Sequence, residues 1–259
     1  MQTIDVRTGD GFDKRDWYFT GGVTNFTQKE RDFLSMDSEG LYSTTQAQDA
    51  QRTTHLISRL PGLSVSVLGR RPVITDACAC CGGNALSFLC SNMFDHVNIV
   101  EIDHTRCAKH LKPNVEFATQ ARRPHTTYNL INGDYVQTCD KLAQDVVFLD
   151  VPWGGPEYKQ QKCLDLCLSH VPLANLAVRL LKHTPEDDTN AMSEFFCPHA
   201  FFYSKNMECK YVVLKLPLNF NVEKLESDAE AAGCVCQVMQ SFKKFNLYVM
   251  QLGWRESVL

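Results

Sequence analysis

Hydrophobic positions along the chain alternate between two patterns, one typical of buried strands and one typical of amphipathic helices. Short runs rich in Val, Ile and Leu predict strands at 73–75, 97–102, 126–134 and 145–149. Apolar residues at helical spacing follow the first two runs, and the second of these helices is expected to stop before Pro113. Strands that alternate with helices predict an α/β fold with a doubly wound parallel sheet.

The flanking segments extend this pattern. Residues 1–36 lack a sustained period and contain Gly21 and Gly22, which predicts an arm or a small helical extension. A helix is expected from Asp49 to just before Pro61. The second half predicts a helix around 163–181, a polar insertion near 184–193, a strand at 210–218, a helix at 222–233 and a hairpin-like pair at 235–242 and 245–254.

Composition narrows the functional classes. Against 30 Asp and Glu, the chain has 26 Lys and Arg, a net charge of −4, so any contact with nucleic acid must be local. We expect no membrane span, because no apolar run is long enough, and the N-terminus lacks a hydrophobic signal core. An intracellular protein of the nucleus, the cytoplasm or both is therefore expected. Cysteines such as Cys90 sit in apolar runs, which favours reduced thiols.

The candidate chemistry lies where the predicted strands end, because open α/β sheets bind ligands outside the carboxyl ends of their strands. Acidic residues follow all four strands: Asp76, Glu101 with Asp103, Asp134, and Asp150. A carboxylate there can accept both hydroxyl groups of a ribose. A phosphate-binding GxxxxGK[ST] loop does not occur, so this arrangement favours a nucleoside ligand without phosphates.

The segment after the fourth strand is the most specific. An Asp, one residue, a Pro and an aromatic residue form a signature of methyltransferases that alkylate exocyclic amines of bases. DVPWGGPEY at 150–158 resembles the SPPWGGPDY segment of the trimethylguanosine synthase family. Further resemblances lie in TDACACCGGNA (75–85, family IDAFCGVGGNT), VEID (100–103), INGD (131–134), DSEGLYSTTQA (37–47, family DxEGWFSVTPE) and LKLPLN (214–219, family FLPRN). The resemblance covers roughly residues 30–255 in order.

The resemblance implies a Rossmann-like class I methyltransferase that uses S-adenosylmethionine. Residues 1–48 would form an extension and lid over donor and cap, and residues 49–259 the methyltransferase domain. The implied reaction methylates the 2-amino group of 7-methylguanosine in RNA caps, giving 2,7-dimethylguanosine, with 2,2,7-trimethylguanosine as a further product. The implied partner is capped RNA, contacted mainly through the cap nucleotide, and a metal-free monomer is expected.

The resemblance also assigns candidate site residues. The methyl donor would contact Thr44, Asp76, Cys78, Gly82, Asn84, Glu101, Ile102, Asp103 and Asp134, with the ribose on Glu101 and the amino-acid end near Asp76 and Asn84. The catalytic group would be Asp150, Pro152 and Trp153. Trp153 would stack on the positively charged base, while Lys215 and Asn219 would also contact the substrate.

This chain departs from the family pattern at four positions. Cys80 replaces a Gly, so an ordinary backbone conformation is expected there. Val151 replaces a Pro, which frees a backbone N–H and loosens the turn. Asp150 stands where Ser is usual and brings a charge near the amine. Leu218 replaces an Arg that contacts the cap phosphates in the family, which leaves that contact to Lys215 or to an N-terminal lysine such as Lys14.

Simpler interpretations remain open for several of these residues. Asp76 and Asp150 are also suited to capping a turn, Trp153 to core packing, and Lys215 to a solvated strand end. A zinc site would draw on Cys78, Cys80, Cys81, His104, Cys107 and His110, but their spacing is not typical of zinc ligands. Two other functions stay as alternatives: an exocyclic-amine methyltransferase of ribosomal or transfer RNA, and a catalytically impaired cap-binding module.

Overall fold

The computed structural model describes residues 12–183 and 207–253, and the predicted polar insertion at 184–193 lies outside these residues. The described chain forms a seven-stranded sheet with the order β3-β2-β1-β4-β7-β9-β8. Its strands are β1 (Val73–Asp76), β2 (His96–Glu101), β3 (Thr127–Asn132), β4 (Val146–Leu149), β7 (Tyr211–Pro217), β8 (Cys234–Ser241) and β9 (Phe245–Leu252). The neighbours from β3 to β7 pair in parallel, and β9 is antiparallel to both β7 and β8. The predicted strands and the doubly wound sheet are therefore confirmed.

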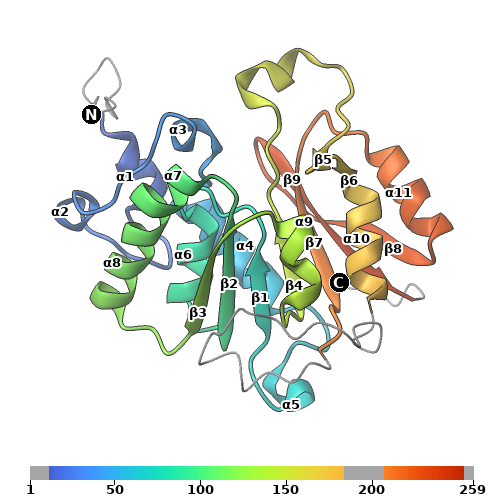
Figure 1. The fold of residues 1–259 in the computed structure, drawn as a ribbon, viewed down its shortest axis with the longest axis horizontal. Coiled ribbons are helices and arrows are strands. Elements are labelled where there is room, and N and C mark those ends of the chain that lie inside the picture. Colours follow the sequence, from blue (N-terminus) through green and yellow to red (C-terminus); the bar gives the residue numbers. More distant parts are fainter. Residues whose placement is uncertain (1–11, 184–206, 254–259) are drawn as a thin grey trace.

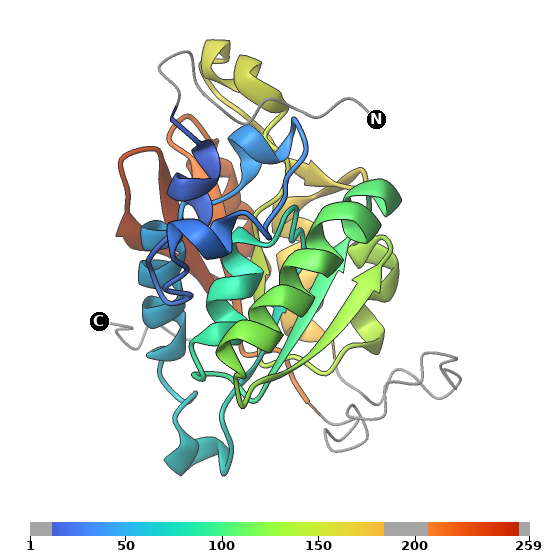
Figure 2. The same cartoon turned by 90° about the vertical axis from the view of Figure 1, so that its left-hand side faces the viewer.

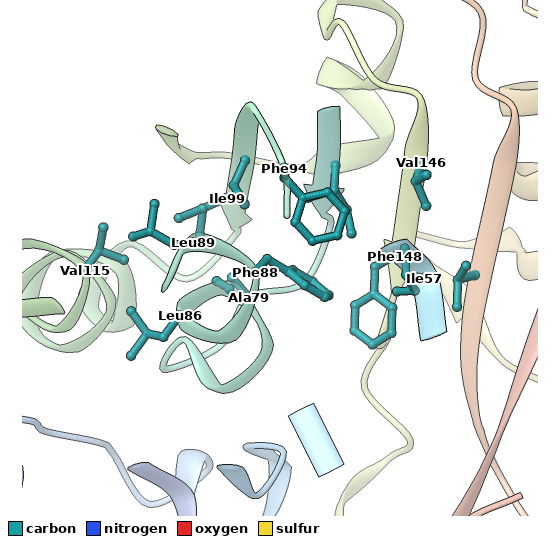
Figure 3. Close-up of a cluster of buried hydrophobic side chains, with 14 of the residues drawn as sticks. Ile57, Ala79, Leu86, Phe88, Leu89, Phe94, Ile99, Val115, Val146 and Phe148 are labelled. Atoms are coloured by element: carbon teal, nitrogen blue, oxygen red, sulfur yellow. The ribbon is translucent and has the colours of Figure 1, made fainter. Parts of the chain in front are cut away.

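Two layers of helices cover the sheet (Figure 1). One layer contains α4 (Ala47–Ser58), α6 (Gly83–Cys90) and α8 (Lys112–Arg122), and the other contains α9 (Tyr135–Thr138), α10 (Leu173–Lys182) and α11 (Val222–Ala231). Side chains along β4 alternate between the two cores, since Phe148 joins the first and Leu149 the second. In the first core, Phe88 packs edge-on against Phe94 and Phe148, as Figure 3 shows.

The N-terminal segment belongs to the first core. It contains α1 (Lys14–Phe19), α2 (Gln28–Arg31) and α3 (Gly40–Ser43), which lie against the body of the molecule in Figure 2. Its buried side chains join the cluster formed by the sheet and α6: Phe19, Phe26, Leu34 and Met36. The predicted small helices are confirmed, and they are packed as part of the core. Between α4 and β1 lies the short helix α5 (Val65–Leu68).

Two predicted helices differ in the structure. The helix after β2 does not stop before Pro113: α7 (His104–Arg106) leads into the π-helical turn η1 (Cys107–Leu111) and then into α8. Pro113 is accommodated because it lies in the first turn of α8, where a backbone N–H has no partner within the helix.

The segment 163–181 is helical only in its second half. Its first half forms the short hairpin β5 (Cys167–Leu168) and β6 (Val171–Pro172), and α10 begins after Pro172. Ser169 and His170 have positive φ angles of 46° and 69°, which form the turn and are incompatible with a helix. The described chain also contains two short 3-10 helices, η2 (Cys139–Lys141) and η3 (Gly155–Gln160). Among the described residues, no helix has the length and apolar character to cross a bilayer.

Candidate active site

The predicted site residues converge where the order of the strands reverses. From β1 the chain runs outward to β2 and β3, and it then returns to place β4 on the other side of β1. This switch point opens a crevice at the carboxyl ends of β1 and β4 in doubly wound sheets. Asp76 ends β1 and Asp150 directly follows β4, so both acidic residues lie at the switch point. In Figure 1 this edge faces upward, together with α3 and α7.

Asp150 lies at the centre of a buried polar network. Its Oδ2 accepts hydrogen bonds from Lys215 Nζ at 2.6 Å and from Asn84 Nδ2 at 3.3 Å. The hydroxyl group of Thr45 donates to the same oxygen at 3.3 Å and accepts from Lys215 Nζ at 2.7 Å. Burial raises the pKa of Asp150, while the Lys215 ammonium counteracts this rise. Within the described chain, these three hydrogen bonds to the carboxyl group all involve Oδ2, and none involves Oδ1.

Asp76 carries the most perturbed carboxyl group of the site. It is 1% exposed, and no side chain of the described structure donates a hydrogen bond to its buried oxygens, while the backbone N–H of Cys78 offers a weak one that lowers its pKa. Burial, followed by the charge of Asp150, raises the pKa of Asp76 to about 8. Asn84 Oδ1 and Thr44 Oγ1 are buried and have no hydrogen-bond partner among the described residues. Because buried polar groups in native proteins are nearly always hydrogen-bonded, these atoms indicate a place for a polar ligand.

Glu101 is held rigidly at the end of β2. Its Oε2 accepts from the backbone N–H of Cys80 and its Oε1 from that of Asp103, each at 2.8 Å. Burial raises its pKa, and Arg106 counteracts this. Cys80 has a φ of 51°, so the ordinary backbone expected for a residue other than Gly is wrong. The hydrogen bond from Cys80 to Glu101 stabilises the left-handed conformation that a Gly would adopt without strain.

The segment 37–47, which we name the lid segment after its predicted role, lies against this edge. Arg106 of α7 joins it to the donor side: Nε donates to Asp37 Oδ2 at 2.8 Å, Nη2 to Glu39 Oε2, and Nη1 to Glu101 Oε1 at 3.3 Å. The backbone of Thr45 also approaches Gly83 closely, because a Cβ atom built on Gly83 would lie 2.7 Å from the Thr45 carbonyl oxygen. Arg106 and Thr45 are not among the residues predicted from the sequence, because a single basic residue in a helix and a second Thr in a loop carry no specific signal.

Other predicted donor residues occupy the surrounding loops. Asp103 caps α7 through a 2.6 Å hydrogen bond from Arg106 N, and Asp134 caps α9 through a 2.9 Å hydrogen bond from Val136 N. Between these loops Ile102 is 62% exposed, as expected for a residue that contacts a ligand face. Cys78 follows β1, and burial, then the charge of Asp76, raises its thiol pKa. Gly82 has a φ of 100° at the start of α6. The donor contacts of these residues stay predictions.

The acceptor side is built around Trp153. The indole is half-buried, and its Nε1 has no hydrogen-bond partner among the described residues although it is buried. Tyr158 packs edge-on against the ring at 5.1 Å, and Lys215 Nζ lies 5.5 Å from its centroid. Pro152 is exposed beside it. The unpartnered N–H and the strand-end position favour a functional ring over a purely structural one.

The side chains of Lys215 and Asn219 both form hydrogen bonds with other residues of the chain. Lys215 is 5% exposed and paired with Asp150, so a solvated lysine is not what the structure shows. The substrate contact of Lys215 stays a prediction, and Leu218 is 59% exposed. Asn219 Nδ2 donates to the carbonyl oxygens of Tyr158 and Gln161 at 2.9 and 2.8 Å, which fixes the loop that carries Trp153. Its direct substrate contact stays a prediction.

The chain is similar to known methyltransferases. A model of the family described as RNA cap guanine-N2 methyltransferase matches residues 71–253. The uncharacterized protein L320 of Acanthamoeba polyphaga mimivirus is 30% identical over 157 residues, 60% of this chain and 49% of that protein. The chain therefore spans about half the length of this curated relative.

Solved structures with related folds have low sequence identity. The 16S rRNA N2 G1207 methyltransferase of T. thermophilus is 13% identical, with a TM-score of 0.48 over 84% of this chain and 44% of that one. The precorrin-6y C5,15-methyltransferase of Geobacter metallireducens is 15% identical, with a TM-score of 0.45 over 86% and 95%. The family match and the seven-stranded sheet confirm the expected Rossmann-like methyltransferase fold. Because the match covers well over half of the chain, this protein belongs to the RNA cap guanine-N2 methyltransferase family.

Proposed function

We propose that this protein transfers methyl groups from S-adenosylmethionine to the exocyclic 2-amino group of 7-methylguanosine in RNA caps. The product is 2,7-dimethylguanosine, and a second transfer gives 2,2,7-trimethylguanosine. Family membership supports the reaction class. The observation that carries the proposal is the meeting of the buried carboxyl group of Asp76 with Asp150 and Trp153 at the switch point of the sheet.

The donor side fits S-adenosylmethionine. When bound, this cofactor supplies a methyl group on a positively charged sulfur, an electrophile that needs no further activation. Asp76 and Asn84 would hold its amino-acid end, because their buried oxygens are acceptors that an ammonium group can satisfy. Glu101 would accept the ribose hydroxyl groups, and Ile102, Asp103 and Asp134 would surround the adenine. The lid segment would exclude water, since Thr45 already packs on Gly83 and Asn84.

The acceptor side fits a positively charged purine. Indole faces attract cations, which contributes about 0.5–2 kcal/mol. Lys215 does not oppose such a base electrostatically, because its charge is matched by Asp150 at 2.6 Å. The Asp150 Oδ1 atom would then accept a hydrogen bond from the 2-amino group and favour the positive charge that develops on its nitrogen. The chain thus contributes mainly orientation, an effect worth up to about 7–11 kcal/mol.

Mass spectrometry of 7-methylguanosine diphosphate incubated with S-adenosylmethionine and the protein tests this function. We expect a product one methyl group heavier and, at longer times, one carrying two added methyl groups. Trp153→Ala should lower the transfer rate by on the order of 100-fold while the donor affinity, measured by calorimetry, stays close to that of the parent protein. An equal loss of donor affinity would refute the assignment of Trp153 to the acceptor side.

The same assay separates the two alternatives. A methyltransferase of ribosomal or transfer RNA would leave the cap nucleotide unmodified and would methylate uncapped RNA. A non-catalytic cap-binding protein would show quenching of Trp153 fluorescence by 7-methylguanosine nucleotides, but no transfer from a labelled donor. Either result would replace the proposed function.

A further inference from the structure

An exposed surface with aromatic and basic side chains adjoins the acceptor side of the site. It consists of Trp17 of α1 together with Lys243 and Lys244 in the turn between β8 and β9, and we name it the Trp17–Lys244 surface. Trp17 is 52% exposed, and both lysines are exposed. We propose that this surface binds the RNA chain that follows the modified nucleotide, with a base stacked on the indole and phosphates beside the ammonium groups. This inference rests on the proposed function and extends it from the cap nucleotide to the RNA body.

The surface is organised in advance of any ligand. Lys244 Nζ lies 5.5 Å from the centroid of the Trp17 ring. The indole Nε1 donates a hydrogen bond to Gln46 Oε1, and Gln46 Nε2 in turn donates to Asp49 Oδ2 at 2.7 Å. The ring is therefore fixed at its N–H edge while about half of its area stays open. A fixed aromatic face loses little conformational freedom when a base stacks on it.

The Trp17–Lys244 surface is connected to the active site through two residues, Thr45 and Phe245, which are sequence neighbours of Gln46 and Lys244. Gln46 follows Thr45, whose hydroxyl group contacts Asp150 and Lys215. Lys244 precedes Phe245, whose ring centroid lies 4.9 Å from Lys215 Nζ. Consecutive Cα atoms are only about 3.8 Å apart. The Trp17–Lys244 surface therefore lies one residue along the chain from two groups that contact Lys215, and we infer that an RNA whose first base lies on Trp153 reaches it.

The charges of this surface are available to a polyanion. Within the described chain, Lys243 and Lys244 form no ion pair with a carboxylate, whereas many of the arginines, such as Arg106 and Arg122, are paired. The whole chain has a net charge of −4, so non-local attraction of RNA is weak and local lysines must provide it. A stacking platform next to unpaired cations is the combination that binds single-stranded nucleic acid without sequence preference.

The test compares two acceptors of different length. One is 7-methylguanosine diphosphate, and the other is a 7-methylguanosine-capped oligoribonucleotide of about ten nucleotides. For the oligonucleotide, we expect Trp17→Ala and the double variant Lys243→Ala/Lys244→Ala each to raise KM by about tenfold, in line with the loss of one stacked base or of phosphate contacts. KM for the diphosphate should stay unchanged. The lysine variant should also weaken the salt dependence of oligonucleotide binding.

Phe33→Ala serves as the matched control, because Phe33 is an exposed aromatic residue that stacks on Phe117 and contacts no residue of this surface. Parent-like KM values for the oligonucleotide in all Trp17 and lysine variants would overturn the inference and leave the surface to a protein partner. An equal rise for both acceptors would also overturn it, since the residues would then act through the lid segment. If the parent protein methylates neither acceptor, the proposed function fails, and fluorescence anisotropy of the labelled oligonucleotide still tests the surface by binding.

Discussion

Two buried ionisable side chains, Asp76 and Lys215, and the largely buried Asp150 lie at one edge of the sheet. Lys215 and Asp150 neutralise each other, and the carboxyl group of Asp76 has no side-chain hydrogen-bond partner within the described residues. Burying polar groups in this way lowers stability, and proteins retain such groups where a ligand later satisfies them. The free energy of unfolding should therefore be lower for the ligand-free protein than for the protein with a ligand bound at this edge.

Asp76→Asn should remove a pH-dependent loss of stability. Because the pKa of Asp76 rises from 3.8 to about 8 on folding, the folded state keeps a proton that the unfolded state has already lost. The free energy of unfolding therefore falls as pH rises from about 4 to about 8, by up to about 1.4 kcal/mol per pH unit from this group. Urea denaturation across this range should show a shallower fall for Asp76→Asn, a higher stability at the alkaline end, and a weaker donor affinity. Parallel curves for the two proteins would contradict the raised pKa.

The Lys215–Asp150 pair should behave as a unit. Lys215→Met or Asp150→Asn alone leaves one charge buried without its partner, which costs about 3–5 kcal/mol of unfolding free energy. The double variant should lose less than the sum of the two single losses, and a double-mutant cycle should give a coupling energy of about 2–3 kcal/mol. Additive losses would mean that the two groups do not interact in solution. Asp150→Ser, which restores the usual family residue, tests separately whether methyl transfer needs a formal charge there.

At the scale of elements, the lid segment and the start of α6 form the closest backbone contact of the site. Gly83 lies against Thr44 and Thr45, and Thr45 extends the contact to Asp150 and Lys215. The helix α3 within the lid also contacts η3 of the loop that follows Trp153. One short segment therefore contacts both the donor side and the acceptor side, so its closure should assemble both together.

Gly83→Ala should displace the lid segment. The new methyl group would lie 2.7 Å from the carbonyl oxygen of Thr45 and 3.0 Å from its nitrogen, distances that force the backbone to move. We expect a large fall in kcat with a smaller loss of stability, of about 1–3 kcal/mol, measured by steady-state kinetics and thermal unfolding. Gly133→Ala is the matched control, because its methyl group would meet only Ile131 at 4.0 Å. Unchanged kcat in Gly83→Ala would show that the close approach is not needed for transfer.

The helix that contains Pro113 shows where a prediction from local sequence is wrong. Pro113 is a strong stop signal, but the helix continues because η1 shifts the hydrogen bonding so that Lys112 N–H bonds to Cys107 O. Tertiary contacts hold this region, since Asn114 Nδ2 donates to Ser35 O and Cys81 O at 2.8 and 2.9 Å. Ser35 and Cys81 are far from Asn114 in the sequence. The local pattern of hydrophobic residues therefore could not predict that the helix continues past Pro113.

At the scale of the whole molecule, the N-terminal segment and the sheet share one hydrophobic core. Phe26 is 1% exposed and packs on Phe117 of α8 at 5.5 Å, with Arg122 above its ring at 4.6 Å. Arg122 in turn pairs with Glu30 of α2. These contacts predict that the segment unfolds together with the sheet in one cooperative transition.

Phe26→Ala should test this cooperativity. Loss of a buried Phe typically costs about 3–5 kcal/mol, and this cost should appear in the global unfolding transition. Phe33→Ala removes an aromatic ring that is 68% exposed and should cost less than about 1 kcal/mol. Denaturation monitored by far-ultraviolet circular dichroism separates the outcomes. If the segment were a loosely attached appendage, both variants would unfold at the parent midpoint.

The sequence by itself determined the alternation of strands and helices, the strand ends that carry acidic residues, and the motif around Trp153. These features are local, because side-chain period and backbone propensity act over a few residues. The tertiary structure alone decided that Lys215 joins Asp150, 65 residues away, that Thr45 joins it across 105 residues, and that Cys80 takes a left-handed conformation to reach Glu101. Such contacts depend on distances that exist only after the sheet and the lid segment have packed, and no local pattern encodes them.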